Sequence, residues 1–142
     1  MTRYSIARRT TNVTIANACL EIIAGAKRVK VVSVEVMLAA ATASVFGLGR
    51  PAAKGITPTT PISMLPDAAG DAGESTVTTA IAWGTGPTVP AQFIRRCSFL
   101  TAIGAIAYWE FVKGLWIPAN GSIVLWNISA TSAVDVNVVV EE

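Results

Sequence analysis

Residues 121–142 read GSIVLWNISATSAVDVNVVVEE, two runs rich in β-branched and aromatic residues with a short polar break between them. Such residues favour a pleated, half-buried sheet. In the second run valines alternate with Asp135 and Asn137, and a period of two is typical of a strand with one buried face. The first run is apolar on both faces, which places it inside a sheet. Because only Ala130-Thr131-Ser132 separates the runs, we predict an antiparallel hairpin in the body of a β fold.

Other parts of the chain show similar alternation on both sides of a long central connection. We predict further strands at Val13–Ala24, Val29–Leu38, Ala39–Ser44, Thr76–Trp83, Ala91–Thr101 and Tyr108–Ile117. Residues 50–75 hold four of the seven prolines and three glycines, so we expect a long loop with little regular structure there. Seven or eight strands without a helix predict an all-β fold, an antiparallel β-sandwich in the form of a jelly roll of about eight strands.

The composition indicates one domain with much apolar surface. The chain has 142 residues, of which 52% are hydrophobic and 14% charged, which is unusually apolar for a soluble monomer. Its two longest apolar stretches, residues 31–49 and 99–118, contain charged residues and do not suit a membrane-spanning helix. We therefore expect no membrane contact. The apolar surface is better explained by a β core and an interface with other subunits.

The charges are distributed unevenly along the chain. The first thirty residues hold six bases and one acid, whereas the last eight hold three acids and no base. Two interpretations stay open: each end is simply solvated, or the opposite ends meet, within or between subunits. The net charge of +2 gives no reason to expect nucleic acid as a partner.

The start of the chain is polar and basic. We interpret residues 1–12 as an N-terminal arm and residues 13–142 as the single jelly-roll domain. The arm is either a frayed terminus or a segment that lies on a partner through Arg3, Arg8 and Arg9. No apolar core of a signal peptide follows these arginines, so we expect the protein to stay in the cytoplasm where it is made.

The sequence lacks the residues that most enzymes of this size use. It has no histidine, which removes Ser-His-Asp and Cys-His catalysis and histidine metal sites. Glu35, Glu110 and Asp135 could form a carboxylate pair of the kind that glycosidases use, but solvated positions on strands explain them more simply. Cys19 and Cys97 predict free buried thiols, although a disulfide between them stays open. We predict no catalytic residue, no metal and no cofactor, and therefore no enzyme.

Two further patterns have structural explanations. Gly47 to Ala52 matches a loose dinucleotide-binding pattern, but Pro51 disfavours the helix that such a site requires. The four tryptophans could form a sugar-binding platform, yet each lies in or beside a predicted strand, where core packing is the commoner use. They are Trp83, Trp109, Trp116 and Trp126.

Four segments of the chain carry a resemblance to a known family. They are Gly47–Pro51, Ala82–Thr85, Gly114–Ala119 and Ser122–Asn127. Together they resemble small proteins of tailed bacteriophages and prophages, among them the jelly-roll cement (decoration) proteins of capsids, of the kind found on a short-tailed Bordetella phage. The resemblance extends from about residue 42 to the end and lies in turns and strands, so it brings no catalytic residue.

That resemblance implies a structural role in a virion. It implies a homo-oligomer, either a homodimer or a homotrimer, attached to the outer surface of the shell and bridging neighbouring major capsid proteins. Arg3, Arg8 and Arg9 of the arm are then candidate contacts with the capsid protein. The alternative is a tail-associated host-recognition or carbohydrate-binding β-sandwich module.

Overall fold

The computed structural model describes residues 1–11, 16–71, 73, 75–129 and 132–142. The described residues form strands, turns and loops, and they include no helix long and apolar enough to cross a membrane. Eight long strands make up the body: β1 (Arg3–Arg9), β2 (Asn17–Ile23), β3 (Val29–Leu38), β4 (Ser44–Gly49), β10 (Phe93–Phe99), β11 (Ile106–Ile117), β12 (Ser122–Ser129) and β13 (Val134–Glu141). Five short strands lie in the connection between β4 and β10: β5 (Ile56–Pro58), β6 (Ile62–Ser63), β7 (Leu65–Pro66), β8 (Thr78–Ala80) and β9 (Trp83–Thr85).

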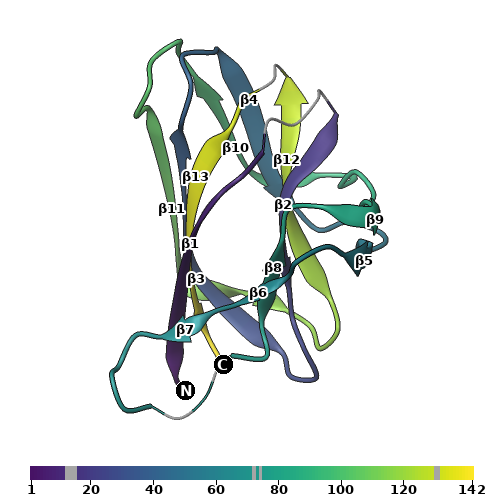
Figure 1. The fold of residues 1–142 in the computed structure, drawn as a ribbon, viewed down its shortest axis with the longest axis vertical. Helices are drawn as coiled ribbons and strands as arrows, with labels where there is room; N and C mark the ends of the chain where they lie inside the picture. The colour runs from purple at the N-terminus through teal and green to yellow at the C-terminus, as the bar shows by residue number, and fades with distance from the viewer. Residues whose placement is uncertain (12–15, 72, 74, 130–131) are drawn as a thin grey trace.

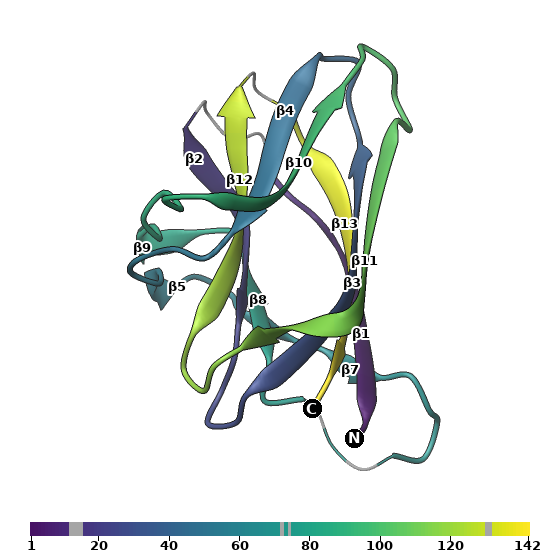
Figure 2. The same ribbon diagram turned by 180° about the vertical axis from the view of Figure 1, so that it is seen from behind.

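The long strands pair in a nested order. β1 pairs antiparallel with β13, β2 with β12, β3 with β11, and β4 with β10. Sheet A runs β11-β3-β13-β1-β7 and sheet B runs β10-β4-β12-β2-β8-β6. The two sheets face each other, and both termini lie at the same end of the sandwich (Figures 1 and 2). This topology is that of a jelly roll, so the predicted fold class is confirmed.

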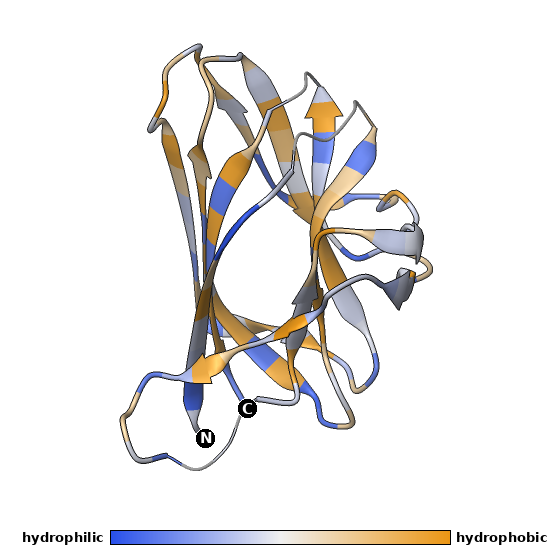
Figure 3. Cartoon of the chain, in the orientation of Figure 1, coloured by the Kyte–Doolittle hydropathy of each residue, from blue (hydrophilic) through white to orange (hydrophobic). Residues whose placement is uncertain are grey.

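One core lies between the two sheets, because alternate residues of each strand point inward. Valines dominate the inner side of sheet A, and larger apolar residues dominate that of sheet B. Fully buried members include Val31, Val36, Val136, Val138, Ile22, Phe46, Leu48 and Ile123. Figure 3 shows how apolar residues predominate along these strands. β3 has the range that its alternation predicts.

The predicted C-terminal hairpin is wrong, although both of its strands exist in the body of the fold. β12 lies in sheet B between β2 and β4, whereas β13 lies in sheet A between β3 and β1. The chain therefore changes sheets after Ser129, and residues 130–131 of this connection lie outside the described residues. Alternation shows that one face of a strand is buried, but it does not show which sheet the strand joins.

The basic N-terminal segment is a strand of sheet A and not an arm. β1 pairs with β13 along its whole length. Tyr4 is 8% exposed and belongs to the main core, and Ile6 packs against that core. The predicted boundary between an arm and a domain is therefore wrong, while residue 12 itself lies outside the described residues. Deletion of residues 1–11 would remove a sheet strand and is expected to destabilise the fold.

Three other strand predictions differ in detail. Residues 39–43 form a loop, and β4 begins only at Ser44. Thr76–Trp83 contains two short strands, β8 and the start of β9, which join different sheets. The first residues of the predicted strand at 13–24, residues 13–15, lie outside the described part of the chain.

The central connection folds back onto the sandwich. β5 and β9 form a two-stranded sheet, and with the surrounding loops (residues 50–60 and 81–92) they form what we call the lobe. The lobe lies on the outer face of sheet B, where Trp83 packs with Val124 and Trp126. β6 and β7 then cross from sheet B to sheet A and add a short strand to each.

Candidate interaction surfaces

Two of the three arginines predicted to contact a capsid protein form ion pairs within the chain. Arg3 lies 3.0 Å from one carboxylate oxygen of Glu141, and Lys30 lies 2.8 Å from the other. Arg9 donates two hydrogen bonds of 2.8 Å to Asp135. Hydrogen bonds from Lys30 and Arg3 lower the pKa of Glu141, and the one from Arg9 lowers the pKa of Asp135. The basic start and the acidic end of the chain therefore meet within one subunit, as one of the two interpretations predicted.

Arg8 connects sheet A to the edge of sheet B. Its Nη1 donates to the carbonyl of Thr79 at 2.5 Å, and its Nη2 donates to the carbonyl of Thr60 at 3.2 Å. Partial burial lowers the pKa of this guanidinium group. All three arginines thus take part in holding the fold together. Their contact with a capsid protein stays a prediction.

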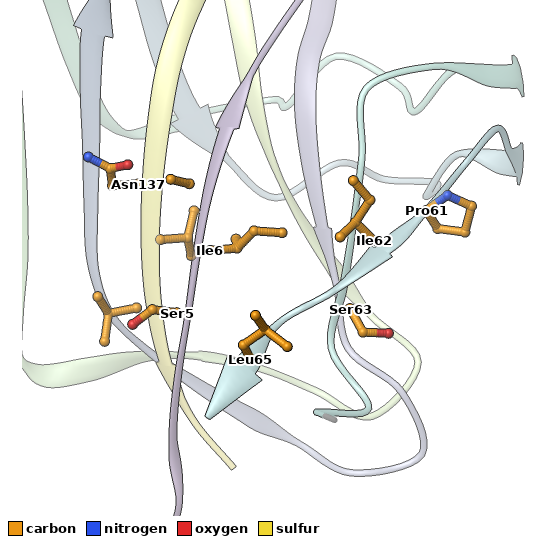
Figure 4. Close-up of a pocket in the computed structure, with 10 residues that line it drawn as sticks. Ser5, Ile6, Pro61, Ile62, Ser63, Leu65 and Asn137 are labelled. Atoms are coloured by element: carbon orange, nitrogen blue, oxygen red, sulfur yellow. The ribbon is translucent and has the colours of Figure 1, made fainter. Parts of the chain in front are cut away.

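An open groove of about 790 Å³ lies between β1 and the crossing segment, residues 61–65. β7 pairs with only two residues of β1, and Ser5, Ile6 and Ala7 of β1 line this groove. Ile6, Ile62 and Leu65 are among the lining residues, and Figure 4 shows Ile6 beside the crossing segment. The described lining residues carry no charged side chain. The groove can accommodate an apolar or extended segment, but it offers no group for acid–base chemistry.

Several highly exposed apolar side chains lie on β11 and on the loop before it. In the loop, Leu100 is 82% and Ile103 is 72% exposed. Along β11, Ile106 and Tyr108 are each 57% exposed and Val112 is 88% exposed. We call these five residues the β11 surface. Exposed apolar surface of this kind can serve as a contact site for another protein when its residues form one large patch.

Glu21 is a buried site that the sequence pattern did not predict. Its side chain is fully buried on the outer face of sheet B, beneath the lobe. The carboxylate accepts hydrogen bonds from the backbone N–H of Gly55, at 3.1 and 3.2 Å, and from the hydroxyl of Ser122, at 2.5 Å. An acid inside the apolar run ACLEII, residues 18–23, was the available signal. The site fastens the lobe to sheet B.

The four tryptophans lie in different layers, so they do not form one sugar-binding platform. Trp126 is buried beneath the lobe, with Trp83 partly buried beside it, and Trp109 packs against the main core. Trp116 is 38% exposed, and the guanidinium carbon of Arg28 lies 4.7 Å from its ring centroid. The prediction of core packing is confirmed for Trp126, holds in part for Trp83 and Trp109, and is wrong for Trp116.

The remaining reactive side chains are dispersed. Glu35 accepts a hydrogen bond from Asn137, and Glu110 lies exposed on β11. Cys19 and Cys97 are free thiols, so the disulfide alternative is wrong. Burial raises the pKa of Cys19 to about 12 and that of Cys97 to about 11. Within the described part of the chain, no three acidic or thiol groups are arranged to hold a metal ion.

Comparisons of the chain with models of protein families, with curated proteins and with solved structures found no match.

Proposed function

We propose that the chain is a structural protein without enzymatic activity that cements a bacteriophage capsid. In this proposal it attaches as a homo-oligomer to the outside of the shell and bridges neighbouring major capsid proteins. The observation that carries the proposal is the β11 surface, a set of highly exposed apolar side chains on a jelly roll whose N-terminal arginines are engaged in its own fold. The resemblance of four segments to capsid cement proteins supports the same role.

The geometry suits attachment by surface contact. A cement protein gains affinity from area and from several simultaneous contacts, because each bound contact raises the effective concentration of the next. The loop between β10 and β11 stands at the end of the sandwich opposite the two termini (Figure 2). Its two most exposed residues, Leu100 and Ile103, would seat against the shell and leave both termini pointing away from it.

Cosedimentation tests the proposal. Shells are prepared from the phage or prophage that encodes the chain, after deletion of its gene, and are mixed with the purified protein. We expect saturable binding, and we expect Leu100→Ser with Ile103→Ser to reduce the bound fraction at least about tenfold, since each side chain would lose apolar burial of roughly 1–2 kcal/mol. Val89→Ser is the matched control, because Val89 is also exposed, at 55%, but lies on the lobe. Failure to bind, or equal loss in the control, would contradict the proposal.

The second candidate is a carbohydrate-binding module of the tail. Trp116 is the observation that favours it, since an outward tryptophan can stack on a sugar ring. Arg28 already lies over that ring, which leaves less of the aromatic face for a sugar. A glycan that protects Trp116 from quenching by acrylamide would favour this second function over the first.

A further inference from the structure

We propose that two copies of this chain pair through β11, antiparallel about a two-fold axis at Trp109, so that their A sheets join into one continuous sheet. The pairing names the partner and the register of the homo-oligomer in the proposed function, and it rests on that homo-oligomer.

β11 is built as an open edge. It stands at the end of sheet A and has β3 as its single strand neighbour among the described residues. The opposite edge of the sheet is the two-residue strand β7, which is too short to template another strand. β11 has twelve residues, and long exposed edge strands present backbone groups to other chains.

The backbone N–H and C=O groups of alternate β11 residues point to the free edge of sheet A, where a second strand could bond to them. Leu38 donates its N–H to the carbonyl of Ala105 at 2.9 Å, and the register continues without shift from Ile106 to Glu110. In an antiparallel ladder, successive residues alternate in the direction of their N–H and C=O groups. Ala105 therefore directs its carbonyl toward β3, and Ala107 and Trp109 direct their backbone groups to the same side. Ile106, Tyr108 and Glu110 direct theirs to the free edge.

The side chains fit one register. When Trp109 sits on the two-fold axis, Tyr108 lies opposite Glu110 of the partner subunit, and Ile106 lies opposite Val112 of the partner subunit. Tyrosine can donate its hydroxyl proton to the carboxylate, and the two aliphatic side chains bury each other. Ile106, Tyr108 and Glu110 are exposed on the same face of β11. Val112 is also exposed and lies in the stretch where the pairing of β11 with β3 changes register. Each of these pairs occurs twice in the dimer.

Neighbouring registers fit less well. A shift that places Glu110 on the axis sets two carboxylates directly opposite each other, which is destabilising. A shift that places Tyr108 on the axis sets Glu110 opposite Ile106 of the partner subunit. A register that pairs even-numbered residues of one copy with odd-numbered residues of the other is also unfavourable. It would set residues with outward backbone groups against residues whose groups are already bonded to β3. Self-complementarity of hydrogen-bonding groups and apolar surface thus selects a second copy of this chain as the occupant.

Sedimentation equilibrium of the purified chain tests the pairing. We expect a monomer–dimer equilibrium, and we expect Ile106→Lys or Val112→Glu alone to raise the dimer dissociation constant at least about tenfold, because each places two charges against aliphatic side chains. The double variant with both substitutions should return to within a few-fold of the original constant, since the introduced ammonium and carboxylate groups then face each other twice.

Ile56→Lys is the matched control, because Ile56 is 62% exposed on the lobe and should leave the constant unchanged. All of these positions are exposed, so thermal unfolding should show that every variant folds. A monomeric or trimeric wild type, unaffected single variants, or a double variant that does not recover would overturn the pairing. A monomeric protein that still cosediments with shells would overturn the pairing alone. A dimeric protein that does not bind shells would overturn the capsid role alone.

Discussion

The backbone N–H of Gly55 donates hydrogen bonds to both carboxylate oxygens of Glu21, at 3.1 and 3.2 Å. The two residues are far apart in sequence, and they join the lobe to the outer face of sheet B. Ser122 adds a third hydrogen bond at 2.5 Å. Within the described residues, no cation forms an ion pair with this buried carboxylate. Its hydrogen bonds therefore offset the cost of burying it.

Substitution of Glu21 should loosen the lobe. Glu21→Ala leaves the N–H of Gly55 and the hydroxyl of Ser122 buried without their acceptor, which costs about 1–3 kcal/mol in the free energy of unfolding. Urea denaturation measures this loss. Asp71→Ala, at an exposed position away from the lobe and from β11, should change the same quantity by less than about 0.5 kcal/mol. Equal effects of the two substitutions would show that Glu21 does not hold the lobe.

A methyl group at Gly55 should be equally damaging for a different reason. A Cβ there would lie 2.2 Å from Cδ1 of Trp83 and 2.8 Å from Oε2 of Glu21. Gly55→Ala should therefore displace Trp83, destabilise the fold by about 1–3 kcal/mol and shift the tryptophan emission spectrum. Gly86→Ala is the control in the same lobe, because a Cβ at Gly86 meets nothing within 4 Å. If Gly55→Ala changed neither the free energy of unfolding nor the emission spectrum, the packing of Trp83 against Gly55 in the lobe would be contradicted.

The pairing of the chain ends predicts acid sensitivity. Hydrogen bonds lower the pKa values of Asp135 and Glu141 from their ordinary values of 3.8 and 4.5. Burial raises the pKa of Glu142, but hydrogen bonds from Thr76 and Ser75 outweigh it and the net shift is also downward. A carboxyl group with a lowered folded-state pKa stabilises the fold fully above its ordinary pKa, and this contribution is lost as pH falls through the folded value.

We therefore expect the free energy of unfolding to be level above about pH 5 and to decline as the pH falls below about 4.5. Glu141→Gln should flatten that decline, because it removes one of the three groups that take up protons on unfolding. The measurement is the denaturation midpoint as a function of pH. A decline of unchanged slope in Glu141→Gln would show that Lys30 and Arg3 do not stabilise the ionised form of Glu141.

The two thiols should be inert in the folded protein. Since burial raises the pKa values of Cys19 and Cys97 to about 12 and 11, almost no thiolate is present at pH 8. Iodoacetamide should label both residues slowly in buffer and rapidly in denaturant without a reductant, and mass spectrometry counts the labels. Rapid labelling of Cys97 in the native state would mean that β10 opens away from β4.

The sequence determines individual strands better than it determines their neighbours. Alternation at Val29–Leu38 gives β3 its correct bounds, because one face of the strand is buried throughout. It could not reveal that β12 and β13 belong to different sheets, since both sheets contribute to one core and impose the same period. Strand pairing in a jelly roll depends on contacts between residues that are distant in sequence.

Other predictions differ from the structure because the same residues are compatible with two structural roles. Arg3, Arg8 and Arg9 suggest a solvated arm, yet Tyr4 and Ile6 alternate with Arg3 and Arg9 and mark the inner face of β1, which Arg8 shares. Gly47 suggests a nucleotide loop, yet it lies in β4, where a Cβ would meet the ring of Phe93 at 2.4 Å. The buried role of Glu21 depends on the lobe, which no local pattern predicts.

Electron cryomicroscopy of intact particles would decide whether the chain is a capsid cement protein. We expect jelly-roll density on the outer surface of the shell, between neighbouring major capsid subunits, with the loop between β10 and β11 against the shell and two copies joined along β11. Density confined to the tail, or particles that lack the chain altogether, would contradict the capsid role.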